Sequence, residues 1–237
     1  MLLYHKMVSK FYYITVSTRP HPILDKLKKK VAEKGETLIV MGENENRIIG
    51  WEGSQNFGLK LKEVSLFVNR NDLEPDDIVL FTDAYDVAYL GNKTEIIGRF
   101  LEFEKPIVFG CEKYCSPDPE MANNYLSSSS STFPFEYEFP YLNSGMFIGY
   151  VWALKKCISE YQYDDRDDDQ RYWTKQFLEI NPDLIQLDYM NRLFLNTVDI
   201  DMKKFEIING NVIYKRRRPL FVHVNGPDKR LIDELVG

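Results

Sequence analysis

The sequence predicts an α/β fold in three layers, α/β/α, around a mostly parallel central sheet. Apolar strand-like runs alternate with helical segments along the first half of the chain, which is the pattern of such folds. Polar residues directly follow one of these runs, at the position where ligands bind in open α/β sheets. The chain has 237 residues and no internal repeat or linker-like segment, so we expect one domain over residues 1–237.

The expected elements of the first half follow in regular order. Each strand is a short apolar run, and each helix has amphipathic spacing or a stop signal such as Gly35. Strands are expected at 11–18, 37–42, 76–83 and 106–112. Helices are expected at 58–70 and 94–104, and before the stop at Gly35.

The second half is less regular. Residues 116–140 are rich in proline and contain five consecutive serines, which predicts a loop. Such a loop is either a tolerated insertion or a cover over a substrate. Further along, we expect an extended run, an acidic loop that enters a helix, a hairpin that turns at Asn209–Gly210, and a late strand followed by a short helix. Their ranges are 141–151, 164–180, 204–216 and 219–227.

Composition excludes some classes of function. The net charge is -6, with 44% hydrophobic and 28% charged residues, which is typical of a globular protein and argues against a general nucleic-acid binder. The basic segment at 215–219 follows the expected hairpin and is most simply a solvated edge. Nuclear targeting is the weaker alternative.

Three cysteines, Cys111, Cys115 and Cys157, do not make a disulfide framework or a zinc site. Free buried thiols are expected. The alternative is a disulfide bond between Cys111 and Cys115 in an oxidising compartment. The N-terminus lacks the features of a signal peptide, and no segment is long and apolar enough to span a bilayer. We therefore expect a cytoplasmic location, host-cell cytoplasm included, unless the chain is an excised lumenal domain.

Two aspartates with a spacing of three follow the strand expected at 76–83. Asp83 and Asp86 lie in the segment TDAYDV, where their charges repel each other unless a positive group lies between them. A divalent cation such as Mn²⁺ or Mg²⁺ takes oxygen ligands of this kind, and Tyr85 offers a flat face for a base. The simpler alternative is a helix N-cap or a turn. The spacing alone leaves both interpretations open.

A histidine near the C-terminus strengthens the metal interpretation. His223 ends an apolar strand, and the following Asn225, Gly226 and Pro227 form a turn that exposes backbone N–H groups. Lys229 comes next, at the start of a helix. A turn followed by lysine is typical of a phosphate site, and the imidazole is a candidate third ligand for the metal. The alternative is a core histidine bonded to a carbonyl group.

Residues 164–169 hold five aspartates, interrupted by Arg166. The simplest interpretation is a helix N-terminus, because Asp167 with Gln170 three residues later resembles a capping box. A cap needs only one aspartate. The remaining aspartates repel one another. A role in binding a sugar or an amine-bearing acceptor would account for their presence.

Seven segments of the sequence together indicate a resemblance to a known family. They are ITVST at 14–18, GWEG at 50–53, LFTDAYDV at 80–87, LNSGMFIGY at 142–150, DDDQRYWTKQF at 167–177, LDYMNRLFLN at 187–196 and HVNGPDK at 223–229. In this order the chain resembles the glycosyltransferase domain of the procollagen lysyl hydroxylases. The resemblance spans nearly the whole chain, and several of the segments are long and distinctive.

The resemblance implies a GT-A-type, Rossmann-like fold, a Mn²⁺ cofactor and a UDP-hexose donor. Asp83, Asp86 and His223 match the family's metal ligands. The positions that match its donor site, with Tyr85 stacked on uracil, are Val16, Thr18, Trp51, Lys60, Tyr85, Asn225, Gly226 and Lys229. The positions that match its catalytic region are Asn143, Asp168 and Asp169.

The chain also departs from the family's pattern. A tryptophan that covers the donor follows a cysteine in the family, whereas Ser116 follows Cys115 here. The cover is therefore either more open or supplied by another aromatic residue such as Tyr114. The family's LDH segment reads LDY, with Tyr189, and the iron-binding hydroxylase domain is absent from this sequence.

By resemblance, the expected activity is Mn²⁺-dependent transfer of a hexose, preferably glucose, from a UDP-sugar to hydroxylysine or galactosyl-hydroxylysine of a collagen-like polypeptide. One alternative is a hydroxylysine galactosyltransferase that uses UDP-galactose. The other is a catalytically silent module that binds UDP and metal and recruits a partner. The intact segments TDAYD, DDDQ and HVNGPDK favour an enzyme. Formation of a homodimer, and retention or inversion at the sugar, are left open.

Overall fold

The computed structural model describes residues 9–50, 56–128 and 137–237. Its central sheet has six strands in the order β2-β1-β3-β6-β5-β7. Their bounds are Leu38–Met41, Phe11–Val16, Ile78–Thr82, Tyr141–Tyr150, Ile107–Glu112 and Ile185–Leu187. Neighbouring strands are parallel except where β6 runs antiparallel to β3 and β5. The prediction of a mostly parallel sheet is confirmed.

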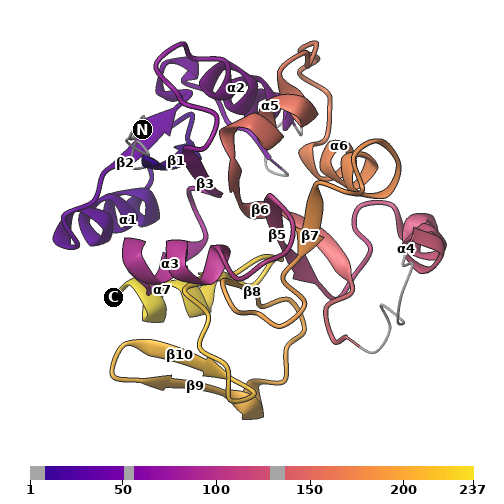
Figure 1. The fold of residues 1–237 in the computed structure, drawn as a ribbon. Coiled ribbons are helices and arrows are strands. Elements are labelled where there is room, and N and C mark those ends of the chain that lie inside the picture. The colour runs from indigo at the N-terminus through magenta and orange to yellow at the C-terminus, as the bar shows by residue number, and fades with distance from the viewer. Residues whose placement is uncertain (1–8, 51–55, 129–136) are drawn as a thin grey trace, which may run out of the picture.

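Helices cover both faces of this sheet (Figure 1). One face packs against α2, α5 and α6, whose bounds are Gly58–Val68, Val151–Ile158 and Asp169–Lys175. The other packs against α1, α3 and a small sheet, with α1 at Pro22–Glu33 and α3 at Lys93–Phe100. The strand β3 is buried along its whole length, because layers lie on both sides of it, as expected for such a fold.

The small sheet has the order β4-β11-β8, with bounds Val87–Tyr89, Phe221–His223 and Phe194–Asn196. β11 is antiparallel to β4 and parallel to β8, and its register sets His223 opposite Val87 and Asn196. The helix α7, Arg230–Val236, follows and packs near α1. The small sheet thus brings the C-terminal histidine to the polar turn that follows β3.

The middle of the chain corrects one expectation. Residues 116–140 were expected to be loop, but they contain a short 3-10 turn at Pro119–Met121 and the helix α4 at Ala122–Ser128. The buried side chain of Tyr125 anchors this helix, since its hydroxyl accepts a hydrogen bond from the backbone N–H of Leu142 at 3.2 Å. The serine run continues into 129–136, which lie outside the described residues.

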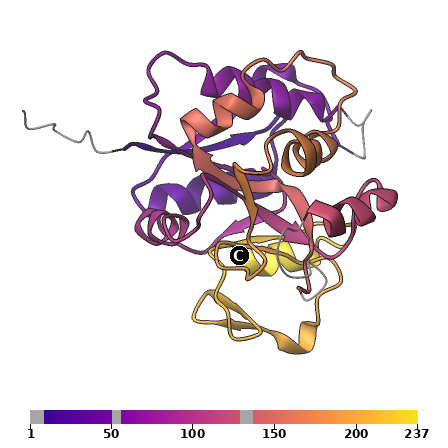
Figure 2. The ribbon, with the colours of Figure 1, turned by 45° about the vertical axis from the view of Figure 1, so that its right-hand side comes forward.

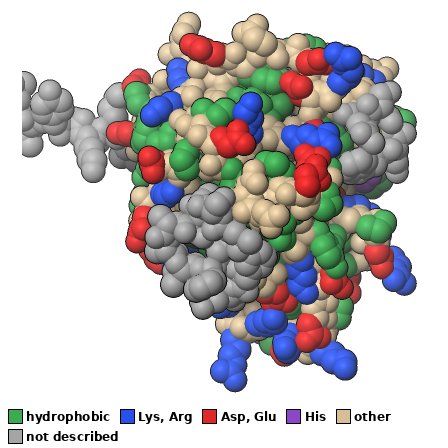
Figure 3. Space-filling view, turned by 90° about the vertical axis from the view of Figure 1, so that its right-hand side faces the viewer, with side chains coloured by type: hydrophobic (Ala, Val, Ile, Leu, Met, Phe, Trp, Pro, Cys, Tyr) green, Lys and Arg blue, Asp and Glu red, His purple; other side chains and the backbone are tan. Residues whose placement is uncertain are grey.

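The expected hairpin is confirmed as β9, Phe205–Ile208, and β10, Asn211–Tyr214. Asn209 and Gly210 both have positive φ, as a tight two-residue hairpin turn requires. Lys215, Arg216 and Arg217 follow it and are exposed. Lys and Arg side chains gather at the lower end of the molecule, where the hairpin lies (Figures 2 and 3), in agreement with a solvated edge.

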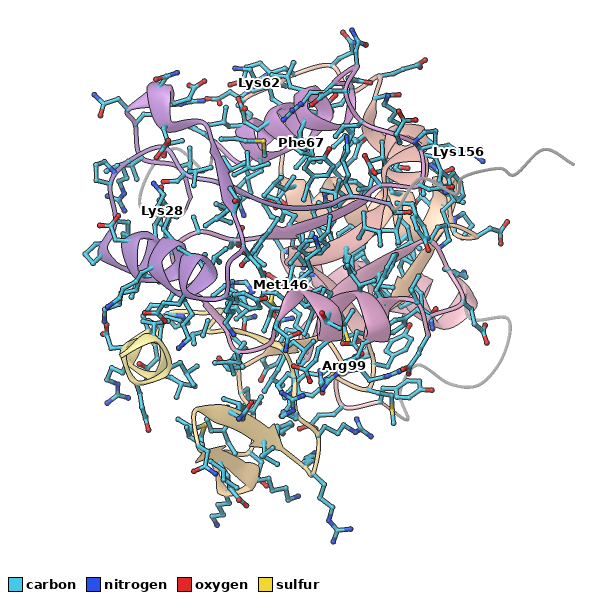
Figure 4. The ribbon with its side chains drawn as sticks, turned by 60° about the vertical axis from the view of Figure 1, so that its left-hand side comes forward. Lys28, Lys62, Phe67, Arg99, Met146 and Lys156 are labelled. Atoms are coloured by element: carbon cyan, nitrogen blue, oxygen red, sulfur yellow. The ribbon has the colours of Figure 1, made fainter. Side chains whose placement is uncertain are left out.

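The core lies on both faces of the central sheet. Met146 of β6 is fully buried and lies in the middle of the molecule, whereas Lys28, Lys62 and Lys156 lie near its edge (Figure 4). Cys111 and Cys157 are buried free thiols, as expected, and Cys115 is a partly buried one. In the described part of the chain, no helix combines the length and apolar character needed to cross a bilayer.

Candidate functional site

Three of the predicted residues form a compact cluster at the carboxyl end of β3. Asp83 and Asp86 lie in the turn between β3 and β4, and His223 is the last residue of β11. Their ligand atoms lie within 4.8 Å of one another. The His223 Nε2 atom is 3.2 Å from Asp86 Oδ1 and 3.8 Å from Asp83 Oδ2. The turn after β3 and the carboxyl end of β11 therefore meet at one point.

Two lysines flank the two carboxylates. Lys60, at the N-terminal end of α2, lies 2.7 Å from Asp83 Oδ1, and Lys229 lies 2.6 Å from Asp86 Oδ2. Burial opposes ionisation of Asp86, but the charges of His223 and Lys229 outweigh it and lower its pKa. Burial would lower the pKa of His223, but Asp86 outweighs it and raises that pKa. Positive groups thus lie beside both aspartates and favour the ionised form of Asp86.

The cluster suits a divalent cation. Two carboxylates and one imidazole are ligands that Mn²⁺ and related ions accept. The His223 ring is 4% exposed, so its orientation is fixed by the protein. Its Nδ1 atom faces the amide oxygen of Asn196 at 2.8 Å, while Nε2 faces the carboxylates. A hydrogen bond at one ring nitrogen, with the second nitrogen directed at the other candidate ligands, is the usual arrangement of a histidine ligand.

The acidic run corrects another expectation. The cap of α6 is Asp168, whose carboxylate accepts the N–H of Arg171 at 2.9 Å, and not Asp167. Asp167 instead accepts the hydroxyl hydrogen of Tyr161 at 2.8 Å. Both aspartates precede a helical turn with suitable spacing, so only the tertiary contact with Tyr161 decides between them. Asp168 therefore has a structural role in addition to any role in catalysis.

The other aspartates of the run also have partners. Asp165 forms a double hydrogen bond with Arg47, with both N···O distances at 2.7 Å, and Asp164 pairs with Arg166. Gly58 permits this packing, because a β-carbon there would lie 1.8 Å from the carbonyl oxygen of Asp164. The apparent surplus of acid is thus largely distributed over local partners.

Asp169 is the member of the run that reaches the cluster. Its Oδ2 atom lies 3.4 Å from Lys60 Nζ and accepts the hydroxyl hydrogen of Ser144 at 2.9 Å. Burial raises the pKa of Asp169, although Lys60 counteracts the rise. For Lys60, burial lowers the pKa, but Asp169 and Asp83 together outweigh it and raise the pKa. A shared ammonium therefore links the catalytic candidate Asp169 to the metal candidate Asp83.

The base-site candidates lie where β1 ends. The Tyr85 hydroxyl lies 3.0 Å from Ser17 Oγ and accepts the backbone N–H of Thr18 at 3.0 Å. The Tyr85 ring lies beside the His21 ring, with centroids 4.6 Å apart. Val16 and Thr18 are buried at this strand end. The structure thus brings Val16, Thr18 and Tyr85 together, close to the cluster because Tyr85 stands between Asp83 and Asp86.

The turn after β11 has a more structural character than expected. The side chain of Asn225 accepts the backbone N–H groups of Thr197 and Val198 at 2.9 and 3.0 Å. Gly226 has φ +83, and a β-carbon there would lie 2.5 Å from Val198 Cγ2. Among the turn's predicted donor residues, Lys229 alone presents a charged group, with a side chain that is 45% exposed.

A buried glutamate that was not predicted joins several candidate residues. Glu112, at the end of β5, accepts amide hydrogen bonds from Asn143 at 2.9 Å, Gln170 at 2.8 Å and Asn225 at 3.0 Å. Burial raises its pKa, against the effect of these amides. Asn143 also accepts the backbone N–H of Gly145 at 3.0 Å, so its amide is committed to protein partners. Sequence reasoning missed Glu112 and gave Gln170 only a capping role, because their bonds join distant elements.

The region around Ser116, where the resemblance implies a tryptophan, is hollow. Ser116 lines a cavity of about 290 Å³ together with residues of the loop before α4 and of α6. Tyr114, the suggested substitute, is 53% exposed and its hydroxyl donates to Asp199 at 2.7 Å. Its role as a cover stays a prediction. Trp51 lies outside the described residues.

Comparison with known proteins identifies relatives of the chain. Residues 7–236 match a family model described as the PLOD GT domain. The chain is 30% identical to a multifunctional procollagen lysine hydroxylase and glycosyltransferase of Caenorhabditis elegans, over 94% of this chain and 31% of that protein. It is also 30% identical to the multifunctional procollagen lysine hydroxylase and glycosyltransferase LH3 of Homo sapiens, over 77% of this chain and 24% of that protein. The chain thus spans about a quarter to a third of the length of these relatives.

A solved structure has a similar fold. It is a glycosyltransferase involved in the glycosylation of the major capsid of PBCV-1, with a TM-score of 0.52, 13% identity, and coverage of 96% of this chain and 98% of that chain. At this level of identity the likeness concerns the fold, and it confirms the predicted class. The family model confirms the predicted resemblance, because it matches nearly the whole chain. The chain belongs to the family of PLOD glycosyltransferase domains.

Proposed function

We propose that this domain transfers a hexose, preferably glucose, from a UDP-sugar in a reaction that depends on Mn²⁺. The acceptor we propose is hydroxylysine or galactosyl-hydroxylysine of a collagen-like polypeptide. The membership of the family supports the class of reaction. The observation that carries the metal dependence is the cluster of Asp83, Asp86 and His223, with ligand atoms within 4.8 Å of one another.

Asp83, Asp86 and His223 are the residues that would hold the cation. A divalent ion there supplies positive charge next to a diphosphate, which makes UDP a better leaving group. Lys229 contributes a second positive charge, because its exposed ammonium lies beside Asp86 and within reach of a ligand at this edge. Charge that is already in position stabilises a developing negative charge without reorganisation.

The base is proposed to bind against Tyr85. Its hydroxyl is tied to Ser17 and Thr18, which fixes the ring in one orientation. Within the described part of the chain, the buried Thr18 Oγ1 atom has no hydrogen-bond partner. A polar atom of this kind is costly when it stays unpaired, and a carbonyl or N–H group of a uracil ring would complete it.

Asp168 and Asp169 are proposed to face the transferred sugar. Asp169 is held by Ser144 and Lys60, and Asp168 stands at the first turn of α6. A carboxylate in this position orients sugar hydroxyls or stabilises a positively charged sugar in the transition state. The amide of Asn143 bonds to Glu112 and to the backbone of Gly145. Asn143 is therefore proposed to hold the catalytic region in place through these bonds.

Two alternatives have distinct outcomes in one experiment. Hydrolysis of UDP-glucose and UDP-galactose, with Mn²⁺, with Mg²⁺ and with EDTA, measures donor use without an acceptor. Turnover of UDP-glucose that requires Mn²⁺ supports the proposal, and preferential turnover of UDP-galactose favours a galactosyltransferase. Binding of UDP and Mn²⁺ without turnover of either sugar, also in the presence of hydroxylysine-containing peptides, favours the silent module.

Other features stay predictions. They are a single domain over residues 1–237, self-association into a homodimer, and the compartment in which the chain acts. Sedimentation velocity over a range of concentrations measures the oligomeric state directly.

A further inference from the structure

The ring of His223 has two amide oxygens beside its Nδ1 atom. Asn196 Oδ1 lies 2.8 Å away and Asn143 Oδ1 lies 3.3 Å away. The shorter contact follows from strand register, because β8 and β11 are parallel and Asn196 is paired with His223. Asn196 is 1% exposed, so no solvent competes for either group.

The orientation of both amides is fixed by their nitrogen atoms. Asn196 Nδ2 donates to the carbonyl oxygen of Cys111 at 3.0 Å, and Asn143 Nδ2 donates to Glu112 Oε1 at 2.9 Å. Rotating either amide by half a turn would direct an N–H group at His223 and an oxygen at another oxygen. Both amides therefore present acceptors to Nδ1, and donation to them requires that Nδ1 carries the hydrogen. Asp86 Oδ1, 3.2 Å from Nε2, is the competing acceptor at the other ring nitrogen, and the two amides oppose it.

We propose that Asn196 is a positioning residue that keeps the neutral His223 ring in the tautomer with its hydrogen on Nδ1, and thereby sets the affinity of the site for a divalent cation. With the hydrogen on Nδ1, the lone pair lies on Nε2, the atom that faces Asp83 and Asp86. In the opposite tautomer an N–H bond would point at the cation. This inference rests on the metal site of the proposed function.

The amide suits this role better than a carboxylate in one respect. Asn196 provides an acceptor without a charge, so the negative charge of the site stays on Asp83 and Asp86. Its second contact, to Cys111 at the end region of β5, holds the amide while the ring is engaged. Partners of this kind that bond to a ligand's second nitrogen typically change metal affinity by 10–100-fold when they are mutated.

Two variants separate the acceptor from the anchor. Asn196→Leu removes both the bond to His223 and the bond to Cys111. Asn196→Asp keeps an acceptor for Nδ1–H but loses the donor to Cys111. If Asn196 acts through the tautomer, Asn196→Asp keeps the Nδ1–H form of His223 and Asn196→Leu loses it. If Asn196 acts only through its bond to Cys111, both variants lose that bond and weaken metal binding equally.

Nitrogen-15 NMR of the histidine rings in the metal-free protein measures the tautomer directly. The chain has only three histidines, His5, His21 and His223, so the His223 signal is assigned by its loss in His223→Gln. At alkaline pH, where the ring is neutral, we expect Nδ1–H in the wild type and in Asn196→Asp. In Asn196→Leu we expect a mixture with Nε2–H.

Calorimetric titration of Mn²⁺ in the same proteins gives the second measurement. We expect the affinity for Mn²⁺ to fall by about 10-fold or more in Asn196→Leu, relative to the wild type. In Asn196→Asp we expect an affinity equal to or higher than that of the wild type. Nε2–H in the wild-type spectrum would overturn the proposal whatever the variants do. Equal weakening in the two variants would overturn it as well. A wild-type protein that shows Nδ1–H but binds no Mn²⁺ would instead remove the metal site of the proposed function.

Discussion

Gly145 lies directly against the ring of His223, and a β-carbon on Gly145 would stand 2.4 Å from His223 Cε1. The backbone carbonyl of Gly145 also accepts the N–H of Asp83 at 2.8 Å. One residue without a side chain thus leaves room for one candidate ligand and bonds to the backbone of another. The glycine of the LNSG segment was not among the predicted site residues.

We expect Gly145→Ala to displace His223 and to lower the affinity for Mn²⁺ by on the order of tenfold or more, since overpacking in a tight site costs about 1–3 kcal/mol. Calorimetric titration measures the loss. Gly98→Ala in α3 is the matched control, because a β-carbon there meets nothing within 4 Å. Equal Mn²⁺ affinity in the two variants would show that His223 is not a ligand or that the ring moves freely.

Lys60→Met tests the shared ammonium between Asp83 and Asp169. Removing it leaves two largely buried carboxylates without their partner, so we expect the free energy of unfolding in EDTA to fall by about 3 kcal/mol. Mn²⁺ should restore more stability to this variant than to the wild type, because it supplies the missing positive charge. Urea denaturation with and without Mn²⁺ gives both values. In the control Lys62→Met, where the lysine pairs with Glu45 at the surface, the loss should stay within about 1 kcal/mol.

The roles of Asp168 and Asp169 can be separated by substitution. Asp168→Ala removes the cap of α6 and should cost about 1 kcal/mol of stability, whereas Asp168→Asn retains a capping side chain. If both carboxylates face the sugar, Asp168→Asn and Asp169→Asn should bind UDP almost normally and transfer sugar much more slowly. Steady-state kinetics and UDP titration provide the comparison. Normal transfer in both Asn variants would leave the acidic run with a structural role alone.

Tyr85→Ala should weaken UDP binding more than the binding of Mn²⁺-pyrophosphate, because only UDP has a base to stack. Base–aromatic stacking is worth roughly 1–3 kcal/mol, which corresponds to a loss of about tenfold or more. Tyr85→Phe keeps the ring but loses the contacts with Ser17 and Thr18, so a smaller loss is expected. If both ligands weaken equally in Tyr85→Ala, the ring packs against the protein and does not stack on uracil.

Much of the fold could be predicted because its long elements have clear periodicity and stop signals. The strands β1, β3 and β5 and the helices α2 and α3 lie within the expected ranges or differ by one residue at an end. The strands β4, β7 and β8 have three residues each, which is too short for a recognisable pattern. The antiparallel direction of β6 was also not evident, because direction depends on pairing with β3 and β5.

The site shows the same division. Asp83, Asp86 and His223 were predicted because motifs mark them, and the structure brings them together. Glu112 and Asn196 were missed, because a single acid and a single amide form no recognisable sequence motif. Their contacts with the site exist only once the strands have paired. The cap was assigned to Asp167 because two adjacent aspartates fit the same capping pattern, and only the bond to Tyr161 distinguishes them.

The bonds of Glu112 have a consequence for folding. They join residues that are 31, 58 and 113 positions away along the chain. Contacts of such high sequence separation form only after large loops have closed, and they slow folding. The site therefore assembles late, when β5, β6, α6 and the turn after β11 have all met. We expect the gain of Mn²⁺ binding during refolding to follow the recovery of helical signal, so that metal binding marks the completely folded chain.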